Sequence, residues 1–324
     1  MSRPTLYITR LLPEPVMAAL RERYSLVPEP VEHQIPTADD LRRGFTQADA
    51  VICTLADPIT DELLAAAPRL KIVANYAVGY NNIDVAAATR RGIVVTNTPD
   101  VLTDATADLT WALILAVARR VVEGDQWARS GTWPGWAPTQ MLGTDVTGKT
   151  LGIIGCGNIG SIVADRAIGL KMKVIAFDPF LSQERAVQLG VEKVELDDLI
   201  KRADFITLHT PLTEKTKNII DADAIKRMKK GVRIVNCARG GLVDEVALYD
   251  ALKSGHVAGA ALDVFSTEPL PGESPLWDME NVIVTPHHGG FHDEYAQKAL
   301  PTIIENFKHF MAGDIAGMIN RVKI

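Results

Sequence analysis

The stretch LGIIGCGNIGSIVADRAIGLKMKVIAFD, Leu151–Asp178, decides the fold of this chain. It opens with a short apolar run bounded by glycine, which predicts a buried parallel strand. The turn GCGNIG comes next, followed by apolar residues at helical spacing. A second apolar run ends in an acid, Asp178. The order is therefore strand, glycine turn, helix, strand and acid.

Each part of this unit has a physical role in binding a dinucleotide. Gly155 permits the tight turn, Gly157 lets backbone approach a pyrophosphate, and Gly160 lets the helix pack close to the strand. The first N–H groups of the helix are unpaired and attract the anion. Asp178 stands at roughly the spacing (~20 residues) from which an acid reaches the adenosine ribose. A bare glycine motif is often only a turn, but this context predicts dinucleotide binding.

The whole chain has the composition of a globular protein with room for two domains, since it has 324 residues, 47% of them hydrophobic. Its net charge of −6 gives no indication of nucleic-acid or anionic-membrane binding. No apolar run reaches ~18 residues without a charge, and the N-terminus lacks the apolar core of a signal peptide. Cys53, Cys156 and Cys237 are odd in number and far apart, so we expect no disulfide framework and a reducing cytoplasm.

The first hundred residues alternate apolar runs with helix-like segments, which predicts a parallel sheet with helices on both faces. Thr37 begins a segment resembling a capping box, and Thr60 is placed to cap another helix. The loop Asn75–Asp84 follows the fourth run, and Gly79 there could expose N–H groups to a carboxylate. An equally good interpretation is the lead-in to a helix capped by Asn82 or Asp84.

Two stretches link this half of the chain to the next. Asp100–Val122 is predicted to form one long, mostly apolar helix. Ser130–Pro138 contains Gly, Pro and two Trp, so it breaks regular structure. Trp133 and Trp136 would suit an interface if exposed, and ordinary packing is the equal alternative.

A second α/β series begins at Leu151, and polar residues follow several of its apolar strands. Arg239 follows Arg233–Asn236, Asp263 and Glu268 follow the next strand, and His287 follows Val282–Val284. The carboxyl ends of parallel strands converge, so these groups are expected in one crevice. Together they would form a workable set, in which Arg binds a carboxylate, Glu orients the acid–base group, and His exchanges protons. A last helix is expected over Asp293–Met311.

The chain resembles the D-isomer-specific 2-hydroxyacid dehydrogenases over essentially its whole length. The resemblance rests on AVGYNNID, GIIGCGNIG, LHTPLTEKT, IVNCARGGLVDE, AGAALDVFSTEPLP and VTPHHGG. Residues up to about 148 look most like glyoxylate/hydroxypyruvate reductases, and residues 149–284 more like phosphoglycerate dehydrogenases. The resemblance to this family implies two Rossmann-like α/β domains with doubly wound parallel sheets. The NAD-binding domain, 101–287, would be inserted into a flavodoxin-like substrate domain made of 1–100 and 288–324, with catalysis in the hinged cleft.

The same resemblance implies roles for individual residues, with NAD as cofactor and no metal. Arg239, Glu268 and His287 match the family's catalytic residues. Leu55, Val78, Gly79 and Arg239 match its substrate-binding positions. Asp263 matches a group near the nicotinamide carboxamide. The matching cofactor-binding positions are Thr106, Gly155, Gly157, Asn158, Ile159, Gly160, Asp178, Thr210, Pro211, Cys237, Ala238, Asp263 and Gly289.

The expected activity is NAD(H)-dependent reduction of a small 2-keto acid, glyoxylate or hydroxypyruvate, by a homodimer. Phosphoglycerate, phosphite and formate dehydrogenases are alternatives, although formate enzymes place Gln where Glu268 stands. A non-catalytic NAD(H)-sensing protein, like the corepressors of this fold, is an alternative from another class. His288, Phe291 and His292 depart from the family pattern after His287. We assign proton exchange to His287, on the argument that successive residues in extended backbone point in opposite directions.

Overall fold

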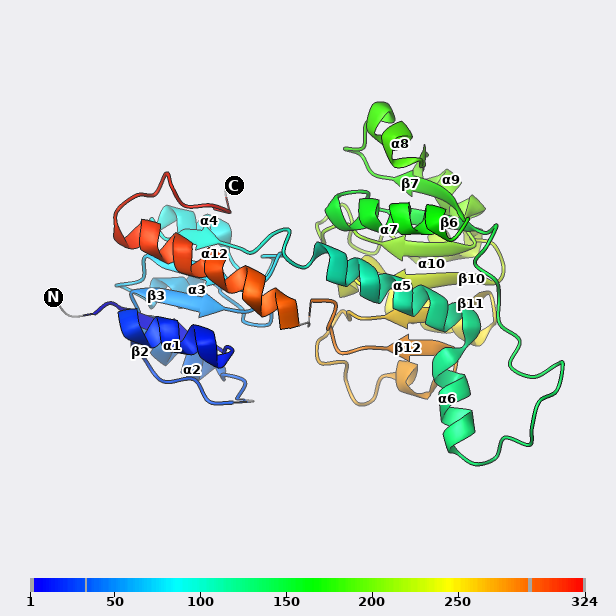
Figure 1. Ribbon diagram of the computed structural model, residues 1–324, viewed down its shortest axis with the longest axis horizontal. Helices are drawn as coiled ribbons and strands as arrows, with labels where there is room; N and C mark the ends of the chain where they lie inside the picture. The colour runs from blue at the N-terminus through cyan, green and yellow to red at the C-terminus, as the bar shows by residue number, and fades with distance from the viewer. Residues whose placement is uncertain (1–2, 33, 291–292, 323–324) are drawn as a thin grey trace. The chain divides into compact units, whose positions relative to one another are not determined.

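The computed structural model describes residues 3–32, 34–290 and 293–322. The chain separates into two compact units. Unit 1 is Met1–Leu102 with His292–Ile324, and unit 2 is Thr103–Phe291. Figure 1 shows the elements of each unit in chain order.

Unit 1 is a five-stranded, all-parallel sheet in the order β2-β1-β3-β4-β5. One face packs against α2, α3 and α4, and the other packs against α1 and α12. The Thr37 capping box and the Thr60 cap are both present, so these two predictions are confirmed. The strands are Thr5–Ile8 (β1), Ser25–Leu26 (β2), Ala50–Cys53 (β3), Ile72–Asn75 (β4) and Val94–Thr96 (β5). The helices are Glu14–Arg23 (α1), Ala38–Gln47 (α2), Asp61–Ala65 (α3), Val85–Arg90 (α4) and Asp293–Met311 (α12).

Unit 2 is a seven-stranded, all-parallel sheet in the order β12-β11-β10-β9-β6-β7-β8. Helices α5 and α7 lie side by side over one face. The strands are Thr150–Ile154 (β6), Lys173–Phe177 (β7), Glu192–Lys193 (β8), Phe205–Leu208 (β9), Val232–Asn236 (β10), Val257–Leu262 (β11) and Val282–Val284 (β12). The helices are Thr103–Arg119 (α5), Val121–Arg129 (α6), Asn158–Gly169 (α7), Gln183–Leu189 (α8), Leu196–Arg202 (α9), Ala222–Arg227 (α10) and Glu245–Lys253 (α11), with the 3₁₀ turns Gly240–Leu242 (η1) and Pro275–Asp278 (η2).

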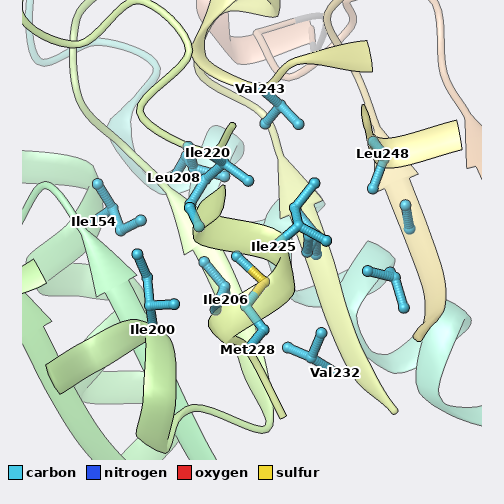
Figure 2. Packing of buried hydrophobic residues seen from close by; sticks show 14 of the residues in the cluster. Ile154, Ile200, Ile206, Leu208, Ile220, Ile225, Met228, Val232, Val243 and Leu248 are labelled. Carbon is cyan, nitrogen blue, oxygen red and sulfur yellow. The ribbon is translucent and has the colours of Figure 1, made fainter. Parts of the chain in front are cut away.

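The other face of this sheet carries the larger part of the core, in which Ile206, Leu208 and Ile225 are almost fully buried. Figure 2 shows aliphatic side chains of β9 and α10 meeting there. Because aliphatic residues cover both faces, the strands read as continuous apolar runs in the sequence.

The prediction of a single helix over Asp100–Val122 is wrong. The helix α5 ends at Arg119, and Arg120 has a left-handed backbone with a φ of 55° before α6 begins. The guanidinium of Arg120 pairs with Glu123 in the first turn of α6, which helps to hold the break. Neither Gly nor Pro marks this position, so no local sequence signal announces it.

Candidate functional site

The glycine turn lies at the carboxyl end of β6, the point where the strand order of the unit 2 sheet reverses. β6 has β7 on one side and β9 on the other, and doubly wound sheets bind ligands at such a point. Gly155 has a φ of 91°, and a Cβ there would lie 2.7 Å from the carbonyl carbon of His209. The same Cβ would lie 2.8 Å from the nitrogen of Thr210, which Pro211 follows. Only glycine fits, so the turn is held against the loop after β9.

The start of α7 has the features of an anion site. Gly157 is the N-cap residue, and no described side chain caps the helix. A Cβ on Gly157 would meet no atom within 4 Å, which leaves the backbone open to a ligand. Gly160 instead packs closely against Gly155, since a Cβ added at Gly160 would lie 2.1 Å from the carbonyl oxygen of Gly155. Asn158 is exposed, and Ile159 packs on the core under α7. This geometry fits the pyrophosphate of a dinucleotide.

Asp178 is fixed beside the turn by two backbone donors. The N–H of Cys156 and the N–H of Phe180 each donate to one of its carboxylate oxygens, both over 2.8 Å. Its negative charge is therefore held just beyond β7, beside the second residue of the turn. This is where an acid would meet the ribose of an adenosine bound at β6.

The cysteines near these strand ends are buried thiols. Burial, with a smaller effect from Asp178, raises the pKa of Cys156 to about 11. Burial raises the pKa of Cys237 to about 12. Both thiols are therefore protonated at neutral pH, and a thiol in that state is a poor nucleophile. They serve as small packing residues at these positions.

Arg239 is carried by a turn after β10 that Asn236 organises. The side-chain amide of Asn236 donates to the Arg239 carbonyl over 2.8 Å, and its oxygen accepts from the N–H of Ala238 over 3.0 Å. The guanidinium of Arg239 donates to the Ala238 carbonyl over 2.6 Å. Burial lowers the pKa of Arg239, and the charge of Glu268 acts against that change. The role of Asn236 was not predicted, because a strand-end Asn carries no distinctive pattern.

Glu268 and His287 form a hydrogen-bonded pair. The Nδ1 atom of His287 lies 2.7 Å from Oε2 of Glu268, while Oε1 of Glu268 accepts from the N–H of Phe265 over 3.0 Å. Burial raises the pKa of Glu268, but these two hydrogen bonds and the charges of His287 and Arg239 outweigh burial and hold that pKa below its usual range. The carboxylate is therefore ionised at neutral pH, and it turns the ring so that Nε2 points away from it.

We predicted His287 rather than His288 by assuming an extended backbone, and that assumption is wrong. His287 is not extended, because its φ is 52°, in the left-handed region. What separates the two histidines is a turn: the N–H of His287 donates to the Thr285 carbonyl, and the N–H of His288 donates to Oδ1 of Asp263 over 3.0 Å. The pairing with Glu268 still distinguishes His287.

Asp263 organises this turn from within the protein. Fully buried, it accepts from the hydroxyl of Thr285 over 2.7 Å and from the N–H of Gly289 over 3.0 Å. The hydroxyl of Thr106, in the first turn of α5, donates to the Gly289 carbonyl over 3.3 Å. Arg239, Glu268 and His287 thus follow three neighbouring strands, β10, β11 and β12, at one edge of the sheet.

The residues predicted to bind substrate in unit 1 follow β3 and β4. Leu55, Val78 and Gly79 are all half-buried. The amide of Asn75 donates to the Gly79 carbonyl and that of Asn97 to the Val78 carbonyl, each over 2.7 Å. Within the described part of the chain, the N–H groups of Val78 and Gly79 donate no hydrogen bond. They are therefore available to an oxygen ligand.

Both interpretations of the Asn75–Asp84 loop hold in part. Asp84 caps α4 by accepting from the N–H of Ala87 over 2.8 Å, as the helix lead-in requires. Among the described helices, none is capped by Asn82; its amide donates to the Thr54 and Asp57 carbonyls. The loop before them keeps its available N–H groups.

Comparison with known proteins identifies the family. The family described as "D-isomer specific 2-hydroxyacid dehydrogenase, NAD binding domain" matches residues 111–289. The chain belongs to the D-isomer-specific 2-hydroxyacid dehydrogenases. It is 45% identical over 314 residues to a glyoxylate reductase of Korarchaeum cryptofilum, covering 97% of this chain and 94% of that protein.

Solved structures of related proteins share the fold of this chain. A protein of Thermus thermophilus matches with a TM-score of 0.91 and 40% identity, over 98% of this chain and 100% of that one. D-lactate dehydrogenase from Aquifex aeolicus, complexed with NAD and lactic acid, matches with a TM-score of 0.84 and 28% identity, over 98% of each chain.

The family predicted from the motifs, the two doubly wound parallel sheets and the oxidoreductase class are therefore confirmed. No helix in the described residues combines the length and apolar character needed to cross a bilayer. Nor do the described His, Cys, Asp and Glu residues form a group that could hold a metal ion.

Proposed function

We propose that this dehydrogenase reduces a small 2-keto acid, with glyoxylate and hydroxypyruvate favoured, to the D-2-hydroxy acid, reversibly and with NAD(H). The observation that carries the proposal is the ionised Glu268 bonded to His287, with Arg239 on the neighbouring strand end. Relatives named glyoxylate reductase at 45% identity support the substrate class. We assign the substrate role to unit 1 and the cofactor role to unit 2.

Each residue of the set has one task in reduction. Arg239 binds the substrate carboxylate and polarises the neighbouring carbonyl, with a planar guanidinium suited to that shape. The nicotinamide, when bound, supplies the hydride that reaches the carbonyl carbon. His287 donates a proton to the carbonyl oxygen and accepts it in the reverse direction. Glu268 favours the protonated imidazole and fixes its orientation.

Substrate contacts in unit 1 would come from the N–H groups of Val78 and Gly79, which are available to a carboxylate, and from Leu55. Cofactor contacts would come from the glycine turn, the strand ends beside it and the loop that Asp263 organises. Those residues are Thr106, Gly155, Gly157, Asn158, Ile159, Gly160, Asp178, Thr210, Pro211, Cys237, Ala238, Asp263 and Gly289.

The preferred cofactor in this proposal is NAD(H) rather than NADP(H). The carboxylate of Asp178 would accept from the ribose hydroxyls and repel a 2′-phosphate. Arg185 is the nearest arginine that follows it in the sequence; it lies on α8 and bonds to Gln188. The measurement is kcat/KM with NADH and with NADPH, and equal or better use of NADPH would contradict the preference.

A panel of acids tests the activity. We expect NADH oxidation with glyoxylate and hydroxypyruvate, and little NAD reduction with 3-phosphoglycerate, phosphite or formate. An NAD(H)-sensing protein without catalysis would bind NADH and oxidise none of it, which is the result that would overturn the proposal. The Arg239→Ala variant controls for contaminating reductases, since it should raise KM for the keto acid strongly.

The assembly we propose is a homodimer formed through α6 and the segment after it. Trp133 and Trp136 are 54% and 83% exposed, and Leu142 is 65% exposed. Leu142 lines a hollow of 660 Å³ together with Val117 and Val122, among others. Aromatic side chains that are this exposed favour an interface, because such residues are enriched there. The free, buried cysteines suit the reducing cytoplasm, which we propose as its compartment.

A further inference from the structure

Arg10 is a cation at the carboxyl edge of the sheet in unit 1, and the proposed mechanism does not use it. Arg10 follows β1, which has β2 on one side and β3 on the other. β1 is therefore the switch point of this sheet, the position where such folds bind ligands. The N–H of Thr9 donates to the Ile52 carbonyl, which continues the pairing of β1 with β3 beyond Ile8. Extending that register brings Arg10 opposite Thr54, next to Leu55.

The guanidinium of Arg10 is anchored by a buried carboxylate. Its Nη1 lies 2.9 Å from Oδ1 of Asp57, whose side chain is 2% exposed against 23% for Arg10. The other oxygen of Asp57 accepts from the hydroxyl of Thr9 and from the N–H and hydroxyl of Thr54. Arg10 therefore cannot swing away without leaving a buried charge unpaired. Such anchoring pre-organises a cation for recognition.

Part of the guanidinium is left for another partner. Arginine carries five N–H donors, and Nη1 of Arg10 is used on Asp57 and on the Thr9 carbonyl. Within the described residues, Nε and Nη2 of Arg10 donate no hydrogen bond. The side chain keeps some exposure, so these donors can meet an acceptor from solvent or from a ligand.

A continuous polar network joins Arg10 to the loop with available N–H groups. The backbone carbonyl of Asp57 accepts from the amide of Asn82 over 3.1 Å. Asn82 lies 3.4 Å from Asn75, which in turn holds the carbonyl of Gly79. Neighbouring strands lie about 4.8 Å apart, so Arg10 after β1 and the loop after β4, with β3 between them, are about two strand spacings apart. A three-carbon acid with a hydrogen bond of about 2.9 Å at each end covers roughly that distance.

We propose that Arg10 determines substrate specificity by donating a hydrogen bond to an oxygen on C3 of a 2-keto acid. The inference rests on the proposed function. With the carboxylate near Val78 and Gly79, the far end of the substrate points along the carboxyl edge of the sheet toward β1. The favoured substrates are then acids with a hydroxyl on C3, such as hydroxypyruvate. Pyruvate has the same carbon skeleton without that oxygen, and glyoxylate has no C3.

The experiment compares hydroxypyruvate with pyruvate, because the pair differs by one hydroxyl. In Arg10→Lys the cation beside Asp57 is retained, but a single nitrogen cannot bridge Asp57 and the substrate. We expect the ratio of kcat/KM for hydroxypyruvate to that for pyruvate to fall on the order of 10- to 100-fold, the effect of one hydrogen bond to a charged group. Activity with glyoxylate should change less than about threefold.

Two further variants separate recognition from folding. Arg10→Leu combined with Asp57→Asn removes the cation and the buried charge together, and it should lose the same discrimination. Arg69→Leu breaks the pair of Arg69 with Asp49, the residue just before β3 at the opposite edge, and should leave the ratio unchanged. The melting temperature of each variant is measured beside its kinetics.

Equal losses with all three acids would assign Arg10 a structural role only and overturn the inference. So would an unchanged ratio in Arg10→Lys. If the unmodified enzyme reduces none of the three acids, the proposed function fails, and the inference fails with it. Reduction of glyoxylate and pyruvate by the unmodified enzyme with no preference for hydroxypyruvate would overturn the inference and leave the proposed function intact.

Discussion

His287 occupies a left-handed backbone conformation that a non-glycine residue adopts only at a cost. The cost is balanced by the bonds that hold the turn at Asp263 and by the pairing of the ring with Glu268. The histidine is thereby fixed in one orientation before substrate arrives. Its neighbour His288 contributes its N–H to the same turn, so the two histidines have different tasks.

Replacing the two histidines separately tests this division. His287→Ala should lower kcat for glyoxylate and hydroxypyruvate by ~10²–10⁴-fold, as the loss of a general acid does. NADH binding, followed by fluorescence, should persist. His288→Ala keeps the N–H that Asp263 accepts and should lose far less. A larger loss of kcat in His288→Ala than in His287→Ala would show that the proton donor is misassigned.

Glu268→Gln changes the pH dependence of reduction. The carboxylate of Glu268, whose pKa is held low, stays ionised until the pH falls below the usual range for a glutamate pKa. Below that point it is protonated and no longer supports His287 with its charge, so kcat of the unmodified enzyme falls on the acid side. Glu268→Gln should lower kcat at neutral pH and remove that acid fall. Glu273→Gln, at an exposed position, serves as the control; an unmoved profile in Glu268→Gln would contradict the pairing.

The residues proposed to react could be predicted from the sequence because each follows an apolar strand. The residues that position them were not. Asn236 and Thr285 hold the turns of Arg239 and His287 through short side-chain bonds, and Asp57 and Asn75 do the same in unit 1. Such bonds join segments far apart in the chain, and single-residue patterns carry no information about them.

Elements with strong periodicity were predicted well, and their interruptions were not. The strands of the Leu151–Asp178 unit agree with the prediction within a residue. The break between α5 and α6 depends on a left-handed Arg120, which nothing in its side chain favours. β8 has two residues, too few for an apolar alternation to be visible.

A second left-handed residue offers a test at the level of the helix. Lys171 follows the C-terminus of α7 with a φ of 59° and an exposed side chain. Glycine adopts this conformation without the Cβ clash, so Lys171→Gly should stabilise unit 2 by about 1 kcal/mol. Lys173→Gly, in extended backbone at the start of β7, should destabilise it by a similar amount. Thermal unfolding measures both, and a lower melting temperature for Lys171→Gly would contradict the argument.

At the level of the molecule, the proposed homodimer depends on the exposed tryptophans of unit 2. Light scattering at micromolar concentration should give about twice the chain mass of 35.2 kDa. Trp136→Ser should weaken the dimer by at least about tenfold, because central aromatic residues dominate interfaces. Ile35→Ser removes a comparably exposed apolar side chain from unit 1 and should not. A monomeric unmodified protein would rule out the dimer.

The two-unit division follows from the chain's pattern only in part. The two α/β series predict two sheets. That the C-terminal segment belongs to unit 1 was expected from the family resemblance alone. The structure shows the reason in the packing: Leu300, Ile303 and Phe307 of α12 are buried against β1, β3 and β4.

This return sets an order of events during synthesis. All of unit 2 leaves the ribosome before α12, so its core can close while unit 1 still lacks one covering helix. Until α12 emerges, the face of the five-stranded sheet around Leu6, Ile8 and Ile72 is covered by α1 alone. Nascent chains arrested before residue 293 should therefore resist protease in unit 2 and be cut in unit 1. Equal resistance of both units in such chains would show that α12 is dispensable for the first sheet.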